Sequence, residues 1–315
     1  MTKDYYIQPD APDPVLSESI VMELVHRHLS EAISVTGVDE NGGEARTYSI
    51  DQNWILKTQR PQQLRPKTSL KKEVFFLDCL KTISGVRVPK VLGYGKEGKN
   101  IEYTLMTRMP GVAIEYAELN GVPRQKVLMG LGQMLRKIHE LPQSLFLESR
   151  LFPGDHSPVD VRWRFGNLFD DVIELIGKSS QPWSFPIDPI KISRLAMSAL
   201  PDVDMWVVLH SNPGPEHVFV FPETHQLSGI IDFGDAYFSH PVHDLRRFRS
   251  PEDRKAVFAG YIAEAPVSEN FIQTWRVAQA VTDMIAIVRN PDYSEAAKED
   301  LDQILKEFQE RDNFK

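Results

Sequence analysis

The side chains best suited to chemistry lie in two short polar segments between positions 210 and 235. His210, Asn212 and His217 belong to the first segment, and Asp232 opens an Asp-Phe-Gly turn in the second. Amide, imidazole and carboxylate groups together can hold a divalent cation and accept a hydrogen bond from a hydroxyl group. In sites that transfer phosphoryl groups, one loop supplies a catalytic group and a metal ligand, and an Asp-Phe-Gly turn supplies a second ligand. The arrangement therefore predicts a phosphoryl-transfer site.

Phosphoryl transfer also requires a cation on a rigid element, because catalysis consists mainly of positioning and of neutralising charge on the phosphates. Lys57 ends an apolar run that is typical of a strand, and Glu73 lies on the helix predicted next. We expect Lys57 to reach the phosphates and Glu73 to pair with it. Asp232 and His217 would hold Mg²⁺, and Asn212 stands where the acceptor hydroxyl belongs.

Strand patterns dominate the first 108 residues, and helical patterns dominate the rest. Around the strands, an opening helix is predicted over 17–29 and one inserted helix over 69–81, with a glycine-bearing turn at 39–43 and further strands at 88–92 and 103–106. Later helices are expected near 122–139, 165–177, 190–200, 251–263, 269–288 and 294–314. The pattern predicts an α+β, bilobal fold in which residues 1–108 form a small β-rich N-terminal lobe and residues 109–315 form a larger, mainly helical C-terminal lobe.

Several motifs occur in an order that is specific, although each alone is weak. They are Trp54-Ile55-Leu56-Lys57, the helix with Glu73, Val88-Pro89-Lys90-Val91-Leu92, the segment 105–111, the segment 131–139, the His210 loop, the segment 229–236 and His240-Pro241-Val242-His243-Asp244-Leu245. In this combination the chain resembles the aminoglycoside phosphotransferase family, the small-molecule-kinase relatives of protein kinases, from about position 35 to position 245. The resemblance implies a protein-kinase-like fold and transfer of a phosphoryl group from ATP or GTP, with Mg²⁺, to a hydroxyl of a small molecule such as an antibiotic.

The resemblance also implies roles for the matching positions. The residues expected at the nucleotide are Lys57, Glu73, Met106 and Arg108. The catalytic loop would contain Asn212, braced by His210, and the metal ligands would be His217 and Asp232. For the acceptor, the expected residues are Asp235 together with Asp160, Asp170 and Glu174 of the helical lobe. Their negative charge suits a cationic small molecule.

Two positions depart from the family pattern, whose loop usually reads His-Gly-Asp and, further on, Asn-Ile-Leu. Asn212 replaces the catalytic Asp, and His217 replaces the metal-binding Asn. An amide oxygen accepts a hydrogen bond from a hydroxyl but cannot take its proton. Since general-base assistance contributes about 10²–10⁴-fold to a rate, Asn212 predicts impaired turnover, whether it is native or an introduced change. Glu216 is a poor substitute base in the sequence. A non-catalytic, nucleotide-binding pseudokinase is the alternative.

Composition limits the other classes of function. Lys and Arg number 36 and Asp and Glu 44, so the net charge of −8 argues against a nucleic-acid-binding protein. Cys79 is the single cysteine, which excludes a disulfide framework and a cysteine-based metal site. The segment 1–14 has no apolar run typical of a secretion signal, and no stretch reaches the roughly 18 apolar residues of a membrane helix. We expect a cytoplasmic protein without membrane association.

A third class, a metal-dependent hydrolase, would use the remaining histidines. The candidates are His210, His217, His225 and His240, with Asp232. Their spacing matches no zinc motif such as His-Glu-x-x-His. The sequence therefore favours the phosphotransferase.

Overall fold

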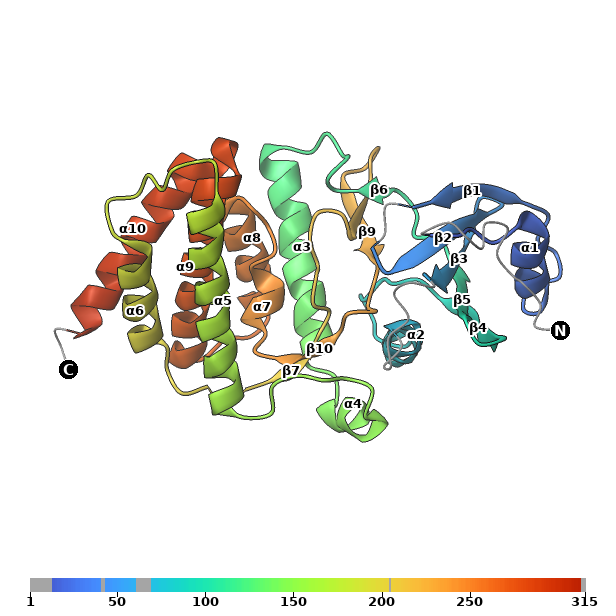
Figure 1. The fold of residues 1–315 in the computed structure, drawn as a ribbon, viewed down its shortest axis with the longest axis horizontal. Coiled ribbons are helices and arrows are strands. Elements are labelled where there is room, and N and C mark those ends of the chain that lie inside the picture. The colour runs from blue at the N-terminus through green and yellow to red at the C-terminus, as the bar shows by residue number, and fades with distance from the viewer. Residues whose placement is uncertain (1–12, 41–42, 61–68, 204, 313–315) are drawn as a thin grey trace. The chain divides into compact units, whose positions relative to one another are not determined.

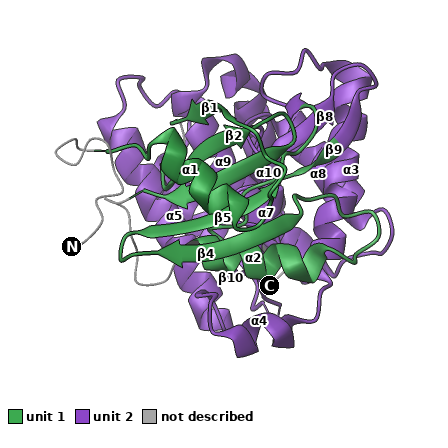
Figure 2. Cartoon of the chain, turned by 90° about the vertical axis from the view of Figure 1, so that its right-hand side faces the viewer, with its two compact units in different colours: residues 1–111, 228–236 green, residues 112–227, 237–315 purple. Residues whose placement is uncertain are grey.

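A segment from the second half of the chain belongs to the same compact unit as the N-terminal residues. The computed structural model describes residues 13–40, 43–60, 69–203 and 205–312. Unit 1 comprises residues 1–111 and 228–236, and unit 2 comprises residues 112–227 and 237–315 (Figure 2). The Asp-Phe-Gly segment thus belongs to the same unit as Lys57. The sequence predicts two lobes divided once, between residues 108 and 109, and so assigns this segment to the C-terminal lobe. Asn41 and Gly42 of the predicted turn lie outside the described residues.

Unit 1 is built on a five-stranded antiparallel sheet with the order β1-β2-β3-β5-β4 (Figure 1). Its strands are β1 (Val35–Asp39), β2 (Ala45–Ile50), β3 (Trp54–Gln59), β4 (Val91–Glu97) and β5 (Ile101–Thr107), and its helices are α1 (Glu18–His26) and α2 (Ser69–Leu80). β3 is the central strand and pairs on both sides, so its backbone is held on both edges. A side chain on β3 therefore projects from a rigid base.

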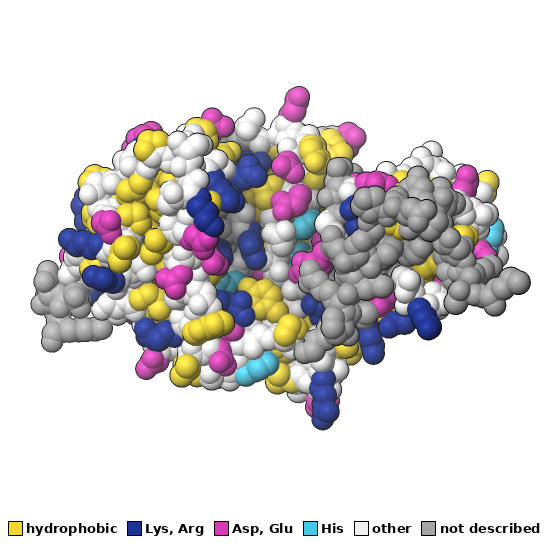
Figure 3. Space-filling model, viewed as in Figure 1, with side chains coloured by type: hydrophobic (Ala, Val, Ile, Leu, Met, Phe, Trp, Pro, Cys, Tyr) yellow, Lys and Arg dark blue, Asp and Glu magenta, His cyan; other side chains and the backbone are white. Residues whose placement is uncertain are grey.

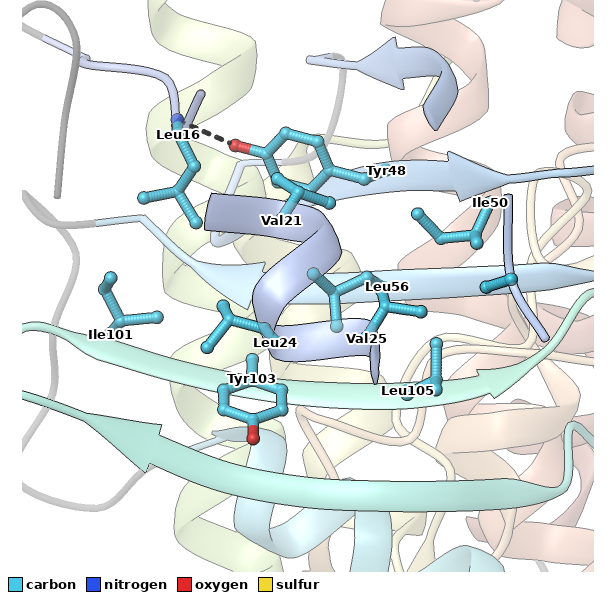
Figure 4. Close-up of a cluster of buried hydrophobic side chains, with 11 residues drawn as sticks. Leu16, Val21, Leu24, Val25, Tyr48, Ile50, Leu56, Ile101, Tyr103 and Leu105 are labelled. Atoms are coloured by element: carbon cyan, nitrogen blue, oxygen red, sulfur yellow. Dashed lines mark hydrogen bonds between the residues drawn. The ribbon is translucent and has the colours of Figure 1, made fainter. Parts of the chain in front are cut away.

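A hydrophobic core forms where α1 covers one face of this sheet (Figure 4). Leu24 and Val25 of α1 pack with Leu56 of β3 and Leu105 of β5, all of them buried. Because successive side chains of a strand point to opposite faces, burial of Leu56 under α1 directs the next side chain, Lys57, to the other face. The packing of one residue thus fixes the direction of its neighbour.

Unit 2 is mainly helical. Its elements are β6 (Val112–Ala113), α3 (Gly121–His139), α4 (Gln143–Ser149), α5 (Pro158–Lys178), α6 (Pro189–Ala199), β7 (Val207–Leu209), β8 (Val218–Phe221), β10 (Tyr237–Ser239), α7 (Val242–Leu245), α8 (Pro251–Ile262), α9 (Glu269–Arg289), the 3₁₀ helix η2 (Pro291–Tyr293) and α10 (Ser294–Asp312). β9 (Gln226–Ile230) leads from unit 2 into unit 1. β7 pairs with β10 and β6 pairs with β8, both antiparallel. α9 is buried along most of its length, with α5, α6 and α10 packed against it.

The predicted elements are largely present, and two boundaries differ for local reasons. α5 begins at Pro158 instead of near 165, because the Ser157 side chain accepts a hydrogen bond from the Asp160 N–H and Pro158 fits the first helical turn. The strand predicted at 88–92 begins only at Val91. Pro89 precedes it and has no N–H to donate to a neighbouring strand. In the described part of the chain, none of the helices is both long and apolar enough to cross a bilayer.

Helices α3 and α8 cross at two glycines that allow their backbones to touch. A Cβ added to Gly132 would lie 2.0 Å from the carbonyl oxygen of Val257, and one added to Gly260 would lie 2.0 Å from the carbonyl oxygen of Met129. No real Cβ occupies such a position. Both glycines are therefore required by packing, although glycine disfavours a helix interior.

We expect Gly132→Ala to lower the free energy of unfolding by about 3 kcal/mol, because α3 and α8 must separate to admit the methyl group. The matched control is Gly166→Ala in α5, where a Cβ meets nothing within 4 Å. That change should raise the free energy of unfolding by roughly 0.5–1 kcal/mol, since alanine favours a helix. Urea denaturation measures both. Equal effects of the two substitutions would contradict the close crossing.

Candidate active site

One candidate group of residues is a cluster of three charged side chains in unit 1. Lys57 lies on β3 between Thr47 of β2 and Thr104 of β5. Its Nζ donates to Glu73 Oε2 of α2 at 3.0 Å and to Asp232 Oδ1 at 2.5 Å. Residues from three separate stretches of the chain therefore meet at one ammonium group, as the sequence predicts for Lys57 and Glu73.

The two carboxylates of this cluster differ in their environment. Burial alone would lower the pKa of Lys57, but Asp232 and Glu73 more than offset it and raise that pKa, so the lysine is charged. Burial raises the pKa of Glu73, whose side chain is 2% exposed, and Lys57 counteracts this effect. The Asp232 side chain is 38% exposed. Glu73 is thus the buried anchor of Lys57, and Asp232 is the partner that solutes can reach.

The turn that contains Asp232 is fixed by its neighbours. Asp232 has a φ of +72°, an uncommon conformation for a residue other than glycine. The ring of Phe233 is buried and packs edge-on against Phe76 of α2, with ring centroids 4.8 Å apart. Lys72 of α2 donates to the carbonyl oxygen of Ala236 at 3.2 Å. α2 therefore positions both Glu73 and the Asp-Phe-Gly turn.

A second candidate group of residues is the loop after β7 in unit 2, and Asp244 organises it. The buried carboxylate accepts hydrogen bonds from the backbone N–H groups of His210 and Ser211, each at 2.8 Å, and from His139 Nε2 at 3.0 Å. Burial alone would raise the pKa of Asp244, but the hydrogen bond from His139 and the other donors outweigh it and lower that pKa. His139 also contacts the hydroxyl of Tyr261 at 3.2 Å. Asp244 therefore anchors this loop.

Within this loop the backbone is strained at Ser211, whose φ is +90°. The family pattern has glycine at this place, for which such a φ is easy. His210 is fully buried, and its Nδ1 accepts the Asn212 N–H at 3.2 Å. The buried His210 ring therefore supports the loop through this hydrogen bond and does not face the solvent.

Asn212 and His217 hold each other in place. His217 Nδ1 donates to the carbonyl oxygen of Asn212 at 2.8 Å, which assigns the proton to Nδ1 and leaves a lone pair on Nε2. The Asn212 side chain donates from Nδ2 to Glu216 Oε1 at 3.1 Å. This bond sets the orientation of the amide, so Oδ1 can accept a hydrogen bond. The contact with Glu216 is one that sequence spacing did not predict.

The residues expected at the acceptor and at the nucleotide are spread over several elements. Asp160 is partly exposed and accepts from the His156 N–H at 3.0 Å and from the Ser157 hydroxyl at 2.8 Å, so it caps α5. Asp170 is exposed on α5, and Glu174 there forms an ion pair with Lys178. Asp235 is exposed in the Asp-Phe-Gly turn, Met106 is buried in β5, and the Arg108 N–H donates to the Asn53 carbonyl at 2.7 Å. Their roles at a ligand stay predictions.

Two groups have the chemistry to hold Mg²⁺. Asp232 offers a partly exposed carboxylate, the kind of ligand that Mg²⁺ prefers. His217 offers an imidazole nitrogen whose partner nitrogen is fixed by a hydrogen bond, as is usual for metal-binding histidine. Among the residues that the structure describes, no three His, Cys, Asp or Glu side chains gather as a metal-binding group. Asp232 belongs to unit 1 and His217 to unit 2, and a joint role at a cation stays a prediction.

Comparisons with known proteins agree with this arrangement. The model of the phosphotransferase enzyme family matches residues 37–281. An aminoglycoside 3'-phosphotransferase of Streptomyces ribosidificus is 26% identical over 151 residues, which are 48% of this chain and 53% of that relative, so the chain spans about half of its length.

Solved structures of similar fold include the GDP complex of wild-type aminoglycoside 2'-phosphotransferase-IIIa, with a TM-score of 0.60, 16% identity and coverage of 92% of this chain and 99% of that one. The apoenzyme of macrolide 2'-phosphotransferase MphH from Brachybacterium faecium has a TM-score of 0.56 and 17% identity, over 89% of this chain and 97% of that one. These likenesses confirm the predicted α+β, protein-kinase-like fold.

We expect Asp244→Asn to lower the free energy of unfolding by about 3 kcal/mol at neutral pH, because one of the buried donors then faces an NH₂ group. The folded state lowers the pKa of Asp244 below its unfolded value of about 3.9. Its contribution is therefore complete above that value and is lost as the pH falls through the lower, folded-state pKa. The difference between wild type and variant should accordingly shrink below about pH 4, as measured by chemical denaturation.

The control for this prediction is Asp302→Asn. Asp302 lies exposed on α10 and pairs with Lys306 at 2.6 Å. Loss of an exposed pair should cost less than about 1 kcal/mol. A variant of Asp244 that is no less stable than this control would show that the carboxylate does not organise the loop.

Proposed function

We propose that this chain, which belongs to the phosphotransferase enzyme family, transfers the γ-phosphoryl group of ATP or GTP to a hydroxyl group of a small molecule. The observation that carries the proposal is the Lys57 ammonium, held on a central strand by Glu73 and Asp232. A rigid cation beside an accessible carboxylate provides what phosphates and a divalent cation need. A cytoplasmic location, where nucleotide is available, accords with this role.

Lys57 would bind the α- and β-phosphates, and Glu73 would keep the lysine in place. Asp232 and His217 would hold Mg²⁺, which neutralises charge on the phosphates when it is bound. Asp232 also accepts a hydrogen bond from Lys57. Met106 and Arg108, at the end of β5, would contact the base of the nucleotide through their backbone.

Asn212 would position the acceptor. Its Nδ2 is engaged with Glu216, so Oδ1 is the atom that accepts a hydrogen bond from the hydroxyl. The amide does not take the proton, so we expect slow turnover. The relatives act on aminoglycosides and a macrolide according to their names, and these two classes are the first acceptors to test.

Removal of the Lys57 charge should weaken nucleotide binding. We expect Lys57→Met to raise the Kd of Mg-ADP by about 10- to 100-fold, the effect of losing hydrogen bonds from a charged donor. Isothermal titration calorimetry measures this constant. The control is Lys96→Met, since Lys96 also lies on a strand of unit 1 but its side chain is 58% exposed. If both variants bind Mg-ADP like the wild type, Lys57 has no role at a nucleotide.

Restoration of a carboxylate at position 212 should restore the base. We expect Asn212→Asp to raise kcat by about 10²–10⁴-fold toward an acceptor that the chain phosphorylates. The measurement is formation of phosphorylated product at saturating Mg-ATP or Mg-GTP. Because the new carboxylate would replace the amide that now donates to Glu216, the gain should be tested with Glu216 present and with Glu216→Gln.

The rates of product formation with and without Asn212→Asp, in the Glu216 and Glu216→Gln backgrounds, distinguish three outcomes. A gain in both backgrounds supports position 212 as the base. Loss of the basal rate in Glu216→Gln alone would assign proton removal to Glu216. If no variant yields product while Mg-ADP still binds, the alternative, a nucleotide-binding pseudokinase, replaces the kinase; Asn212 is the observation that favours it.

A further inference from the structure

Arg246 and Arg247 have no ion pair with a carboxylate among the described residues. Arg246 is 9% exposed, and its Nε is buried without a hydrogen-bond partner there. Its Nη1 makes a long contact with Thr282 Oγ1, at 3.4 Å. Arg247 is partly exposed, but its Nε is likewise buried without a partner. A buried charge is costly unless it is paired, so the Arg246 guanidinium requires an explanation.

The carboxylates of the surrounding elements are already engaged. Asp244 is used by the loop after β7. Asp155 accepts two hydrogen bonds from Arg164, at 2.6 and 2.8 Å, and a third from the Ser239 hydroxyl. Asp283 of α9 is paired with Arg254, a fully buried arginine of α8. Around Arg246, the described part of unit 2 therefore offers cations and neutralised pairs, but no spare anion.

The neighbourhood of these arginines is strongly positive. Burial, together with the charges of Arg247, Arg254 and Arg164, lowers the pKa of Arg246 to about 9. Burial and the nearby arginines also lower the pKa of His243 well below its usual range, and its Nε2 is buried without a hydrogen-bond partner. The ring of His243 packs on Phe165 of α5, with centroids 4.9 Å apart. An anion placed here would relieve the repulsion.

One side of this cluster is open to solutes. Arg164 is 30% exposed in its side chain, and its guanidinium lies 4.6 Å from the centroid of the Tyr237 ring, which is partly exposed. Figure 3 shows a hollow in the face of unit 2 next to α5, with Lys or Arg and His side chains in it. The exposed Trp163 of α5 is the neighbour of Arg164 in the chain. Arg247 is itself partly exposed, so a small molecule can reach this side of the cluster.

We propose that Arg246 and Arg247, with Arg164 and Tyr237 at the entrance, bind an oxyanionic group of the acceptor, a phosphate or a carboxylate. A guanidinium group presents parallel N–H donors that match the two oxygens of such a group. This inference rests on the proposed function and names its substrate class. It assigns the acceptor a charge opposite to that of the cationic molecule expected from the sequence; of the residues expected to bind that molecule, Asp160 takes part in a helix cap and Glu174 in an ion pair.

Inorganic phosphate and acetate are the probes. Each is titrated calorimetrically into the full chain, against sodium chloride at equal ionic strength. We expect saturable binding of at least one probe, weakened about 10-fold or more in Arg246→Gln and in Arg247→Gln. Binding should be unchanged in Arg249→Gln, since Arg249 is exposed and lies outside the cluster. The stronger probe identifies the group as phosphate or carboxylate.

Lys57→Met separates this site from a nucleotide site, because binding of the probe should persist in that variant. Should Arg246→Gln fail to fold, as judged by circular dichroism, Arg247→Gln carries the test. Absence of saturable binding in the wild type, or equal affinity in both arginine variants, would overturn the proposal. Mg-ADP binding is measured on the same samples: its absence would remove the proposed function alone, whereas loss of probe binding alone would remove the anion site.

Discussion

The structure of the candidate site depends on one constraint, a lysine ammonium that two carboxylates hold on a central strand. Lys57 points away from the α1 core because Leu56 points into it. Glu73 is buried and needs the lysine charge, and the turn with Asp232 needs α2, which carries Glu73. Any change that moves β3 or α2 therefore changes the place of the Asp232 carboxylate. The sheet, α2 and the turn thus jointly fix the position of the Lys57 ammonium.

In unit 2, a buried carboxylate holds a loop in place in a comparable way. Asp244 collects the His210 and Ser211 N–H groups and His139, and so fixes the loop that presents Asn212 and His217. The strained φ of Ser211 is maintained by this anchoring. Two residues further, the chain carries Arg246 and Arg247, whose charges are not balanced by described carboxylates. The same short segment thus anchors the loop with Asn212 and carries the two arginines of the proposed anion site.

Sequence reasoning found the residues of the charged cluster because each carries a strong local signal. Strand alternation placed Lys57, helical spacing placed Glu73, and Asp-Phe-Gly marked Asp232. It could not find the partnership of Asn212 with Glu216, because loop geometry decides which side chains meet. Charge type alone led to the prediction that Asp160 and Glu174 lie at the acceptor. The helix cap and the ion pair in which they take part are local contacts that the sequence did not predict. The sequence did not indicate Arg246 and Arg247 as candidate binding residues, because their burial, and not their residue type, makes them unusual.

The central claim is that the charged cluster serves phosphoryl transfer to a small molecule. Its most direct test supplies γ-labelled ATP or GTP with Mg²⁺ and pooled small hydroxyl compounds, both neutral and anionic, to the native chain and to the Asn212→Asp chain. We expect label in an organic phosphate monoester, formed faster by the aspartate form and absent with Asp232→Asn. Label that stays in the nucleotide or appears only as inorganic phosphate, in both chains, would show that the cluster does not serve this transfer.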